Sequence, residues 1–195
     1  MIYRWYYGSM SGQKIKGSIL KSRLEFVRSE IGEEGLSNLM DDLPEEDQKI
    51  LGRLVAVAWV DFAVGKRLDE AIVKALGGGS ARFFERLGEA SAEVNLTTLH
   101  SAFVAPGDPQ AFLAKAPQIY RLYYDVGWRE YEAIGEREGM LITHDAETFS
   151  KPDCLTVVGW YRKALELCGA KNVRIMEEEC RATGGNVCKY RVTWQ

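Results

Sequence analysis

The sequence lacks a long apolar run, an excess of basic residues and a secretory signal. No apolar run approaches the roughly 20 residues that a membrane-spanning helix needs, so no membrane span is expected. Lys and Arg number 25 against 28 Asp and Glu, and a net charge of −3 argues against nucleic acid as a partner. The short aromatic start has no cleavage site, so the sequence predicts a reducing, cytoplasmic location.

Histidine is also scarce, which limits the case for catalysis. His100 and His144 are the only two histidines. Neither stands at a spacing typical of a Ser–His–Asp or Cys–His site. The glycines of Gly77–Gly79 are followed by Ser80 and not by the Gly-Lys-Ser/Thr of a phosphate loop, so they indicate the end of a helix. The sequence therefore predicts a protein that is not an enzyme.

The length of 195 residues and a hydrophobic content of 46% are typical of one globular domain. Gly8-Ser9-Met10 reads like a joint before a second initiator methionine. We therefore expect residues 1–13 to be a tag or disordered leader, with residues 1–9 as its foreign part. Residues 14–195 are expected to form a single domain.

Hydrophobic periodicity predicts helices first and strands later. The helical patterns cover residues 18–31, 35–42, 63–76, 81–103, a segment after 109 with a kink at Pro117, and 153–167. Alternating patterns predict strands over 127–133, 140–144, 172–178 and 187–194. The apolar run 54–62 fits either a buried helix end or an extended segment. This order predicts an α+β fold in which helices pack on an antiparallel sheet.

All four cysteines lie in the last 42 positions. Cys180 and Cys188 flank the hairpin turn at Gly184-Gly185, and Cys154 begins the preceding helix. Three thiolates and a nearby carboxylate are sufficient for a tetrahedral, structural zinc site. Spacing alone leaves open the alternative of buried, inert thiols. Cys168 lies about 21 Å from Cys154 along the helix, too far to share an ion.

Residues 152–192 resemble the C-terminal half of a 4-vinyl reductase domain, which ends in a Glu-x2-Cys-x7-Cys hairpin after a helix that begins with Cys. This arrangement also occurs in the sensor domains of phenol- and xylene-responsive activators. The resemblance implies a zinc cofactor held by Cys154, Glu177, Cys180 and Cys188, beside a pocket for an aromatic ligand. In a regular strand Glu178, and not Glu177, would face the same way as Cys180.

The chain from about Lys14 to Trp194 also resembles an uncharacterised family expanded in myxobacteria, through segments such as KGSILKSRLEFVR, RLDEAI, PQIYRLYYDVG and DCLTVVGW. That resemblance implies the fold shared by 4-vinyl reductase domains, haem–nitric-oxide sensors and Bet-type subunits of the TRAPP tethering complex. In these proteins helices pack on an antiparallel sheet, often around a lipophilic cavity.

Aromatic residues crowd the middle of the chain and the helix after Cys154. They are either core side chains or the lining of a pocket for a small ligand. The candidate pocket residues are His100, Phe103, Tyr120, Tyr123, Tyr124, Trp128 and Trp160.

From these features we expect a non-enzymatic sensor that binds an aromatic or lipid-like molecule and contains a structural zinc site. A homodimer or a signalling protein would read out binding. The alternatives are a TRAPP-like protein–protein adaptor without a free ligand and, more weakly, a reductase-like enzyme.

Overall fold

The computed structural model describes residues 12–146 and 149–195. The predicted leader over residues 1–13 therefore lies almost entirely outside the described residues. The first element, strand β1 (Lys14–Lys16), begins where the domain is expected to start.

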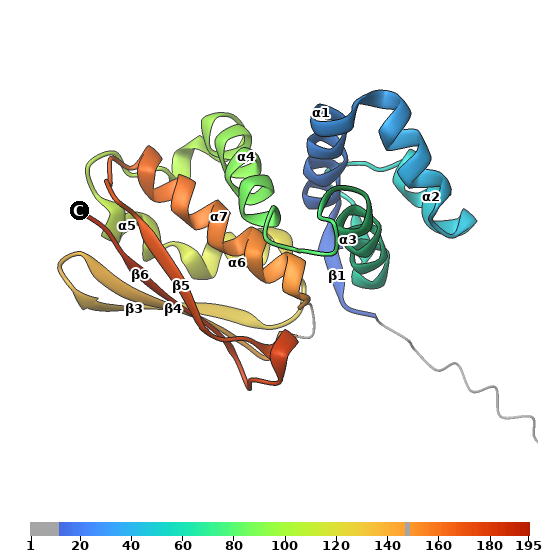
Figure 1. The fold of residues 1–195 in the computed structure, drawn as a ribbon. Helices are drawn as coiled ribbons and strands as arrows, with labels where there is room; N and C mark the ends of the chain where they lie inside the picture. Colours follow the sequence, from blue (N-terminus) through green and yellow to red (C-terminus); the bar gives the residue numbers. More distant parts are fainter. Residues whose placement is uncertain (1–11, 147–148) are drawn as a thin grey trace, which may run out of the picture.

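The C-terminal half forms a four-stranded antiparallel sheet, as its alternation of apolar and polar residues predicts. Its strands are β3 (Trp128–Gly135), β4 (Glu138–His144), β5 (Arg174–Glu179) and β6 (Cys188–Thr193), in the spatial order β3-β4-β6-β5. Figure 1 shows the helices α4 (Phe84–Thr97), α6 (Ala116–Tyr123) and α7 (Lys151–Leu167) together on one side of this sheet. The predicted α+β fold with helices on an antiparallel sheet is confirmed.

The N-terminal helices form a second group, on the far side of α4 in Figure 1. They are α1 (Gly17–Asp41), α2 (Glu45–Gly52) and α3 (Phe62–Leu76). Gly32 interrupts α1 with a φ of 72°, which only glycine adopts easily and which separates the two helices expected there. The run 54–62 is extended at its end, because strand β2 (Trp59–Asp61) pairs with β1.

Two helices differ from the sequence prediction: one ends earlier than expected, and the other is divided into two. The helix expected over 81–103 ends at Thr97, and a short 3-10 turn follows at Ser101–Phe103. The hydroxyls of Thr97 and Thr98 bond back to the carbonyls of Glu93 and Val94, a local alternative to helix propagation. The expected kink at Pro117 is a break between α5 (Pro109–Leu113) and α6, because proline fits the first turn of a new helix.

Helices α4 and α7 cross closely enough to require glycine on both sides. A Cβ atom on Gly88 would lie 2.2 Å from the carbonyl oxygen of Thr156. A Cβ atom on Gly159 would lie 1.8 Å from the carbonyl oxygen of Glu85. Both distances are far inside van der Waals contact, so backbone packs directly against backbone at this crossing.

A buried ionic network joins the N-terminal helices to the rest of the domain. Arg23 on α1 donates from Nε to Oδ1 of Asp69 on α3 at 2.5 Å and from Nη2 to Oδ1 of Asp153 on α7 at 3.0 Å. The hydroxyl of Tyr124, which follows α6, bonds to both oxygens of Asp153. Arg23, Asp69 and Asp153 are at most 4% exposed. The network therefore links four segments that are far apart in the sequence.

None of the helices in the described part of the chain combines the length and apolarity needed to cross a bilayer.

The glycine contact between α4 and α7 predicts a large stability difference between two alanine variants. Gly159→Ala must push α7 away from the backbone of α4, and we expect a loss of at least about 3 kcal/mol in the free energy of unfolding. Gly52→Ala on α2, where nothing lies within 4 Å, should change stability by less than about 1 kcal/mol. Urea unfolding measures both values. Equal stability of the two variants would contradict the close crossing.

The ionic network predicts a specific pH dependence of stability. Burial raises the pKa of Asp69 from 3.8 to about 6, against the opposing charge of Arg23. Between about pH 4 and pH 6 the folded chain therefore holds a proton that the unfolded chain has lost, and the contribution of Asp69 to stability falls as the pH rises. Unfolding free energies of wild type and Asp69→Asn should diverge across this window and run parallel above it. Curves that stay parallel from pH 4 to pH 7 would refute the shift.

Candidate functional site

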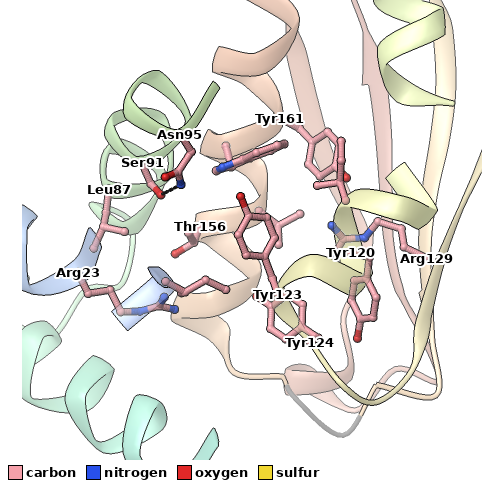
Figure 2. Close-up of a pocket in the computed structure, with 14 residues that line it drawn as sticks. Arg23, Leu87, Ser91, Asn95, Tyr120, Tyr123, Tyr124, Arg129, Thr156 and Tyr161 are labelled. Carbon is pink, nitrogen blue, oxygen red and sulfur yellow. Dashed lines mark hydrogen bonds between the residues drawn. The ribbon is translucent and has the colours of Figure 1, made fainter. Parts of the chain in front are cut away.

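A cavity of about 50 Å³ lies between the N-terminal helix α1, the helices α4, α6 and α7, and the start of β3 (Figure 2). Its walls are mainly aromatic and aliphatic, with a few hydroxyl, amide and guanidinium groups. The lining residues are Ile19, Arg23, Leu87, Ser91, Asn95, Ile119, Tyr120, Tyr123, Tyr124, Arg129, Thr156, Val157, Trp160 and Tyr161.

Polar atoms without partners are concentrated around this cavity. In the described part of the chain four buried side-chain nitrogen or oxygen atoms lack a hydrogen bond, and three of them belong to cavity residues: Arg23 Nη1, Tyr123 Oη and Tyr161 Oη. Leaving a buried polar group unsatisfied costs about 1–3 kcal/mol. Burial raises the pKa of Tyr123, so its hydroxyl is a neutral hydrogen-bonding group. The cavity therefore offers donors that the protein itself does not use.

Arg129 brings a second guanidinium to the cavity from β3. Its Nε donates to Thr143 Oγ1 on the neighbouring strand at 2.9 Å, and the group lies over the rings of Tyr120 and Tyr161. Arg129 is only 6% exposed. No carboxylate of the described residues lies within 4.0 Å of its guanidinium, whereas Arg23 contacts two. The positive charge of Arg129 is thus buried among phenols and a hydroxyl.

The structure divides the seven predicted pocket residues into two groups. Tyr120, Tyr123, Tyr124 and Trp160 line the cavity, and the other three predicted residues do not. His100 lies outside with its ring against Phe103 and Tyr123, at centroid distances of 6.1 and 5.8 Å.

Trp128 is outside the cavity as well, stacked on His144 with 4.2 Å between ring centroids. His144 also contacts Glu130 at 2.8 Å. Neither histidine of the chain lines the cavity.

Sequence reasoning missed both arginines of the cavity. Arg23 lies in a helix of mixed charged and apolar residues, and nothing in that pattern separates it from the solvated Arg28 one turn later. Arg129 has a weak signal, because the alternation of β3 places it on the covered face with Tyr131.

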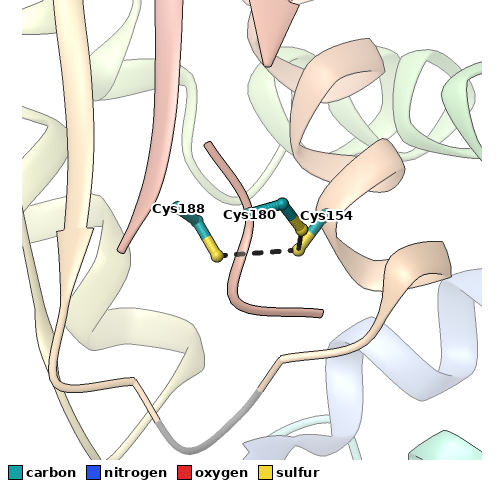
Figure 3. A group of neighbouring side chains, drawn as sticks. All are labelled: Cys154, Cys180 and Cys188. Atoms are coloured by element: carbon teal, nitrogen blue, oxygen red, sulfur yellow. Dashed lines mark hydrogen bonds between the residues drawn. The ribbon is translucent and has the colours of Figure 1, made fainter. Parts of the chain in front are cut away.

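The three predicted thiol ligands converge beside the cavity (Figure 3). Cys154 Sγ lies 3.8 Å from Cys188 Sγ and 3.6 Å from Cys180 Sγ, and all three thiols lie within 4.8 Å of one another. The α7 N-terminus, the end of β5 and the start of β6 supply them. All three are buried and none forms a disulfide. Cys168 is apart from them, in contact with the backbone of Ala105.

Glu177 points toward the covered side of the sheet but does not join the three thiols. Glu177 pairs with Tyr190 and its side chain is 11% exposed, while Glu178 bonds to Arg191. The bulge between Glu177 and Glu179 then reverses the alternation, so that Cys180 is buried on the same side as Glu177. One carboxylate oxygen of Glu177 contacts Lys151, and the other is buried without a partner. Among the residues that the structure describes, the group of neighbouring candidate ligands therefore contains three cysteines and no carboxylate.

Hydrogen bonding sets the charge of the thiols. A bond from the Cys154 thiol lowers the pKa of Cys188 to about 6 against the effect of burial, and the backbone N–H of Arg181 contributes at 3.5 Å. Hydrogen bonds to Cys180 and Cys188, together with burial, raise the pKa of Cys154. These hydrogen bonds favour the thiolate form at Cys188 and the thiol form at Cys154.

The fold is that of H-NOX proteins, although sequence identity to them is low. The unliganded Fe(II) H-NOX protein from K. algicida is 14% identical, with a TM-score of 0.73 over 92% of this chain and 96% of that one. An H-NOX protein from S. oneidensis in the Fe(II)NO state is also 14% identical, with a TM-score of 0.66 over 92% and 99%. An oxygen-binding H-NOX domain related to soluble guanylate cyclases is 11% identical, with a TM-score of 0.66 over 92% and 95%.

These comparisons correct two expectations. The predicted zinc cofactor is wrong, because the structures that share this fold are Fe(II) proteins, and others among them concern haem distortion in the H-NOX family. The role of Cys154, Glu177, Cys180 and Cys188 as metal ligands has no support beyond the convergence of the thiols, and it stays a prediction. The expected membership of the 4-vinyl reductase domains and the expected relation to TRAPP subunits are also wrong, because the matching family model is a different one and the similar structures are H-NOX proteins.

No curated protein matches the sequence significantly. One family model does match, over residues 79–195, which is more than half of the chain. The matched region includes α4, α6, α7 and the whole four-stranded sheet, and hence most of the cavity wall. The chain therefore belongs to the family described as "Protein of unknown function (DUF2378)".

Proposed function

We propose that this protein is a non-enzymatic binding domain that senses a small molecule in the cavity between α1, α4, α6, α7 and the sheet. The observation that carries the proposal is a set of three buried polar atoms without a hydrogen bond, all of them on residues that line one cavity. A bound molecule with hydrogen-bonding groups would satisfy them. The H-NOX fold supports the proposal, because proteins of that fold bind oxygen or nitric oxide.

Haem does not fit the residues of this cavity. Haem iron needs an axial ligand such as His, Cys, Met or Tyr. None of the described residues that line the cavity is a His, Cys or Met, and burial raises the pKa of Tyr123, which disfavours a phenolate. The volume of about 50 Å³ is also well below the roughly 300–1,000 Å³ of sites for drug-sized ligands.

The same volume limits the ligand. A cavity holds about one water-sized group per 10–15 Å³ by this measure, so about three to five non-hydrogen atoms fit without movement. A larger aromatic or lipid-like molecule, as expected from the sequence, requires side chains such as Tyr123 or Trp160 to move. We therefore propose a ligand of about three to five non-hydrogen atoms in preference to a larger aromatic one.

The position of Arg23 suggests how binding is sensed. Arg23 lines the cavity, and its other nitrogens hold Asp69 and Asp153, which belong to helices α3 and α7. A ligand that bonds to Arg23 Nη1 changes the environment of the residue that joins the two helical groups. Binding would thereby favour one arrangement of these groups over another. A homodimer or a signalling protein that contacts them is the proposed reader.

A cavity-filling variant tests the proposed site. We expect a small-molecule panel of phenol, benzyl alcohol, acetate and benzoate to contain at least one compound that raises the melting temperature of the wild type. At one hundred times its dissociation constant the rise should be about 5–10 °C. Ser91→Leu fills the cavity from α4 and should abolish the shift.

Ser37→Leu makes the same change at an exposed position of α1 and should leave the shift intact. An equal shift in wild type and Ser91→Leu would mean that the compound binds elsewhere, which contradicts the proposal.

A further inference from the structure

We propose that the ligand of this cavity is a small organic carboxylate whose charge is paired by Arg129. This inference rests on the proposed function, because it assigns the ligand class of the same site.

Arg129 is the starting point, because it is a buried cation that forms no ion pair with any carboxylate in the described part of the chain. Arginine stays charged in proteins, and a buried charge without a partner is strongly unfavourable. Arg129 is 6% exposed and contacts the Thr143 hydroxyl and two tyrosine rings. These neutral neighbours solvate a guanidinium only in part. An anionic ligand bound in the cavity would supply the charge that pairs with Arg129.

The two buried carboxylates of the Arg23 network are already engaged with other partners. Asp69 takes both of its bonds from Arg23, and Asp153 takes bonds from Arg23 and from the hydroxyl of Tyr124. Asp153 forms no ion pair with Arg129. The two carboxylates thus belong to the network on the Arg23 side, and a ligand anion at Arg129 replaces no existing pair.

The remaining lining favours a carboxylate over a larger anion such as phosphate. A carboxylate is planar and matches the guanidinium fork, and its oxygens accept bonds from hydroxyl and N–H donors such as Tyr123 Oη and Arg23 Nη1. Acetate and propionate have four and five non-hydrogen atoms and fall within the size that the cavity accepts, about three to five atoms. The aliphatic side chains of Ile19, Ile119 and Val157 suit the hydrocarbon part of the molecule.

The experiment compares each acid with its neutral amide of the same shape. Acetate, propionate and benzoate are titrated against acetamide, propionamide and benzamide by calorimetry at constant ionic strength. We expect the acid of at least one pair to bind about tenfold to a hundredfold more tightly than its amide. In Arg129→Met this preference should disappear, while Arg162→Met, a change at an arginine already paired with Glu85 and Glu89, should retain it.

Stability gives a second readout that does not depend on a ligand. Replacing an unpaired buried charge with an apolar side chain of similar volume is often neutral or stabilising. Without ligand, Arg129→Met should therefore melt at or several degrees above the wild type. If this variant does not fold, Thr143→Val removes the acceptor that positions Arg129 Nε and should weaken binding of the acid with little effect on the amide.

The outcomes separate the two proposals. Equal or tighter binding of the amides, or an unchanged acid preference in Arg129→Met, overturns the carboxylate assignment and leaves the binding function standing. Binding of phenol or benzyl alcohol without any acid has the same meaning. Failure of every acid, amide and alcohol to bind the wild type overturns the proposed function itself.

Discussion

The buried guanidinium of Arg23 is the interaction on which the arrangement of this domain depends. It is 1% exposed, and a charge in that position is tolerated only because Asp69 and Asp153 approach it from two other helices. Removal of Arg23 would leave the buried carboxylates of Asp69 and Asp153 without their cation. The three residues therefore fix where α1 and α3 lie relative to α7, and they leave Arg23 Nη1 at the wall of the cavity.

Backbone contact at Gly88 and Gly159 sets the other side of the same space. Because α4 and α7 meet without side chains between them, side chains close to this crossing on both helices line the cavity. Ser91 and Asn95 come from α4, and Trp160 and Tyr161 come from α7. A rigid helix crossing, and not a loop, thus determines the shape of this wall, which is what a selective site requires.

The comparison with H-NOX proteins illustrates that a shared fold does not establish a shared ligand. The two share the helices, the sheet and the chain path over most of their length. In this chain, tyrosines and a tryptophan reduce the central space to about 50 Å³, and the two histidines lie elsewhere. The same scaffold therefore presents a small polar cavity with two arginines, and its chemistry follows from those residues.

The sequence by itself determined the order of elements and much of their extent. Periodicity placed α3, α7 and the four strands of the sheet, because each element shows its own repeat of apolar residues. It also placed Cys154, Cys180 and Cys188 near one another, since a hairpin and the helix before it are local features. The resemblance to 4-vinyl reductase domains misled, because a short cysteine pattern over about 40 residues does not establish a family or a cofactor.

Only the tertiary structure decided which residues share the cavity. Arg23 and Arg129 are 106 positions apart, and no local pattern relates a residue of the first helix to a residue of the third strand. His100 and Trp128 are absent from the cavity lining, because the His100 ring packs on the edge of Tyr123 after the end of α4 and Trp128 stacks on His144. Local periodicity predicts which face of a helix or strand is buried. Which residues of other elements contact that face depends on how the distant segments of the chain pack together.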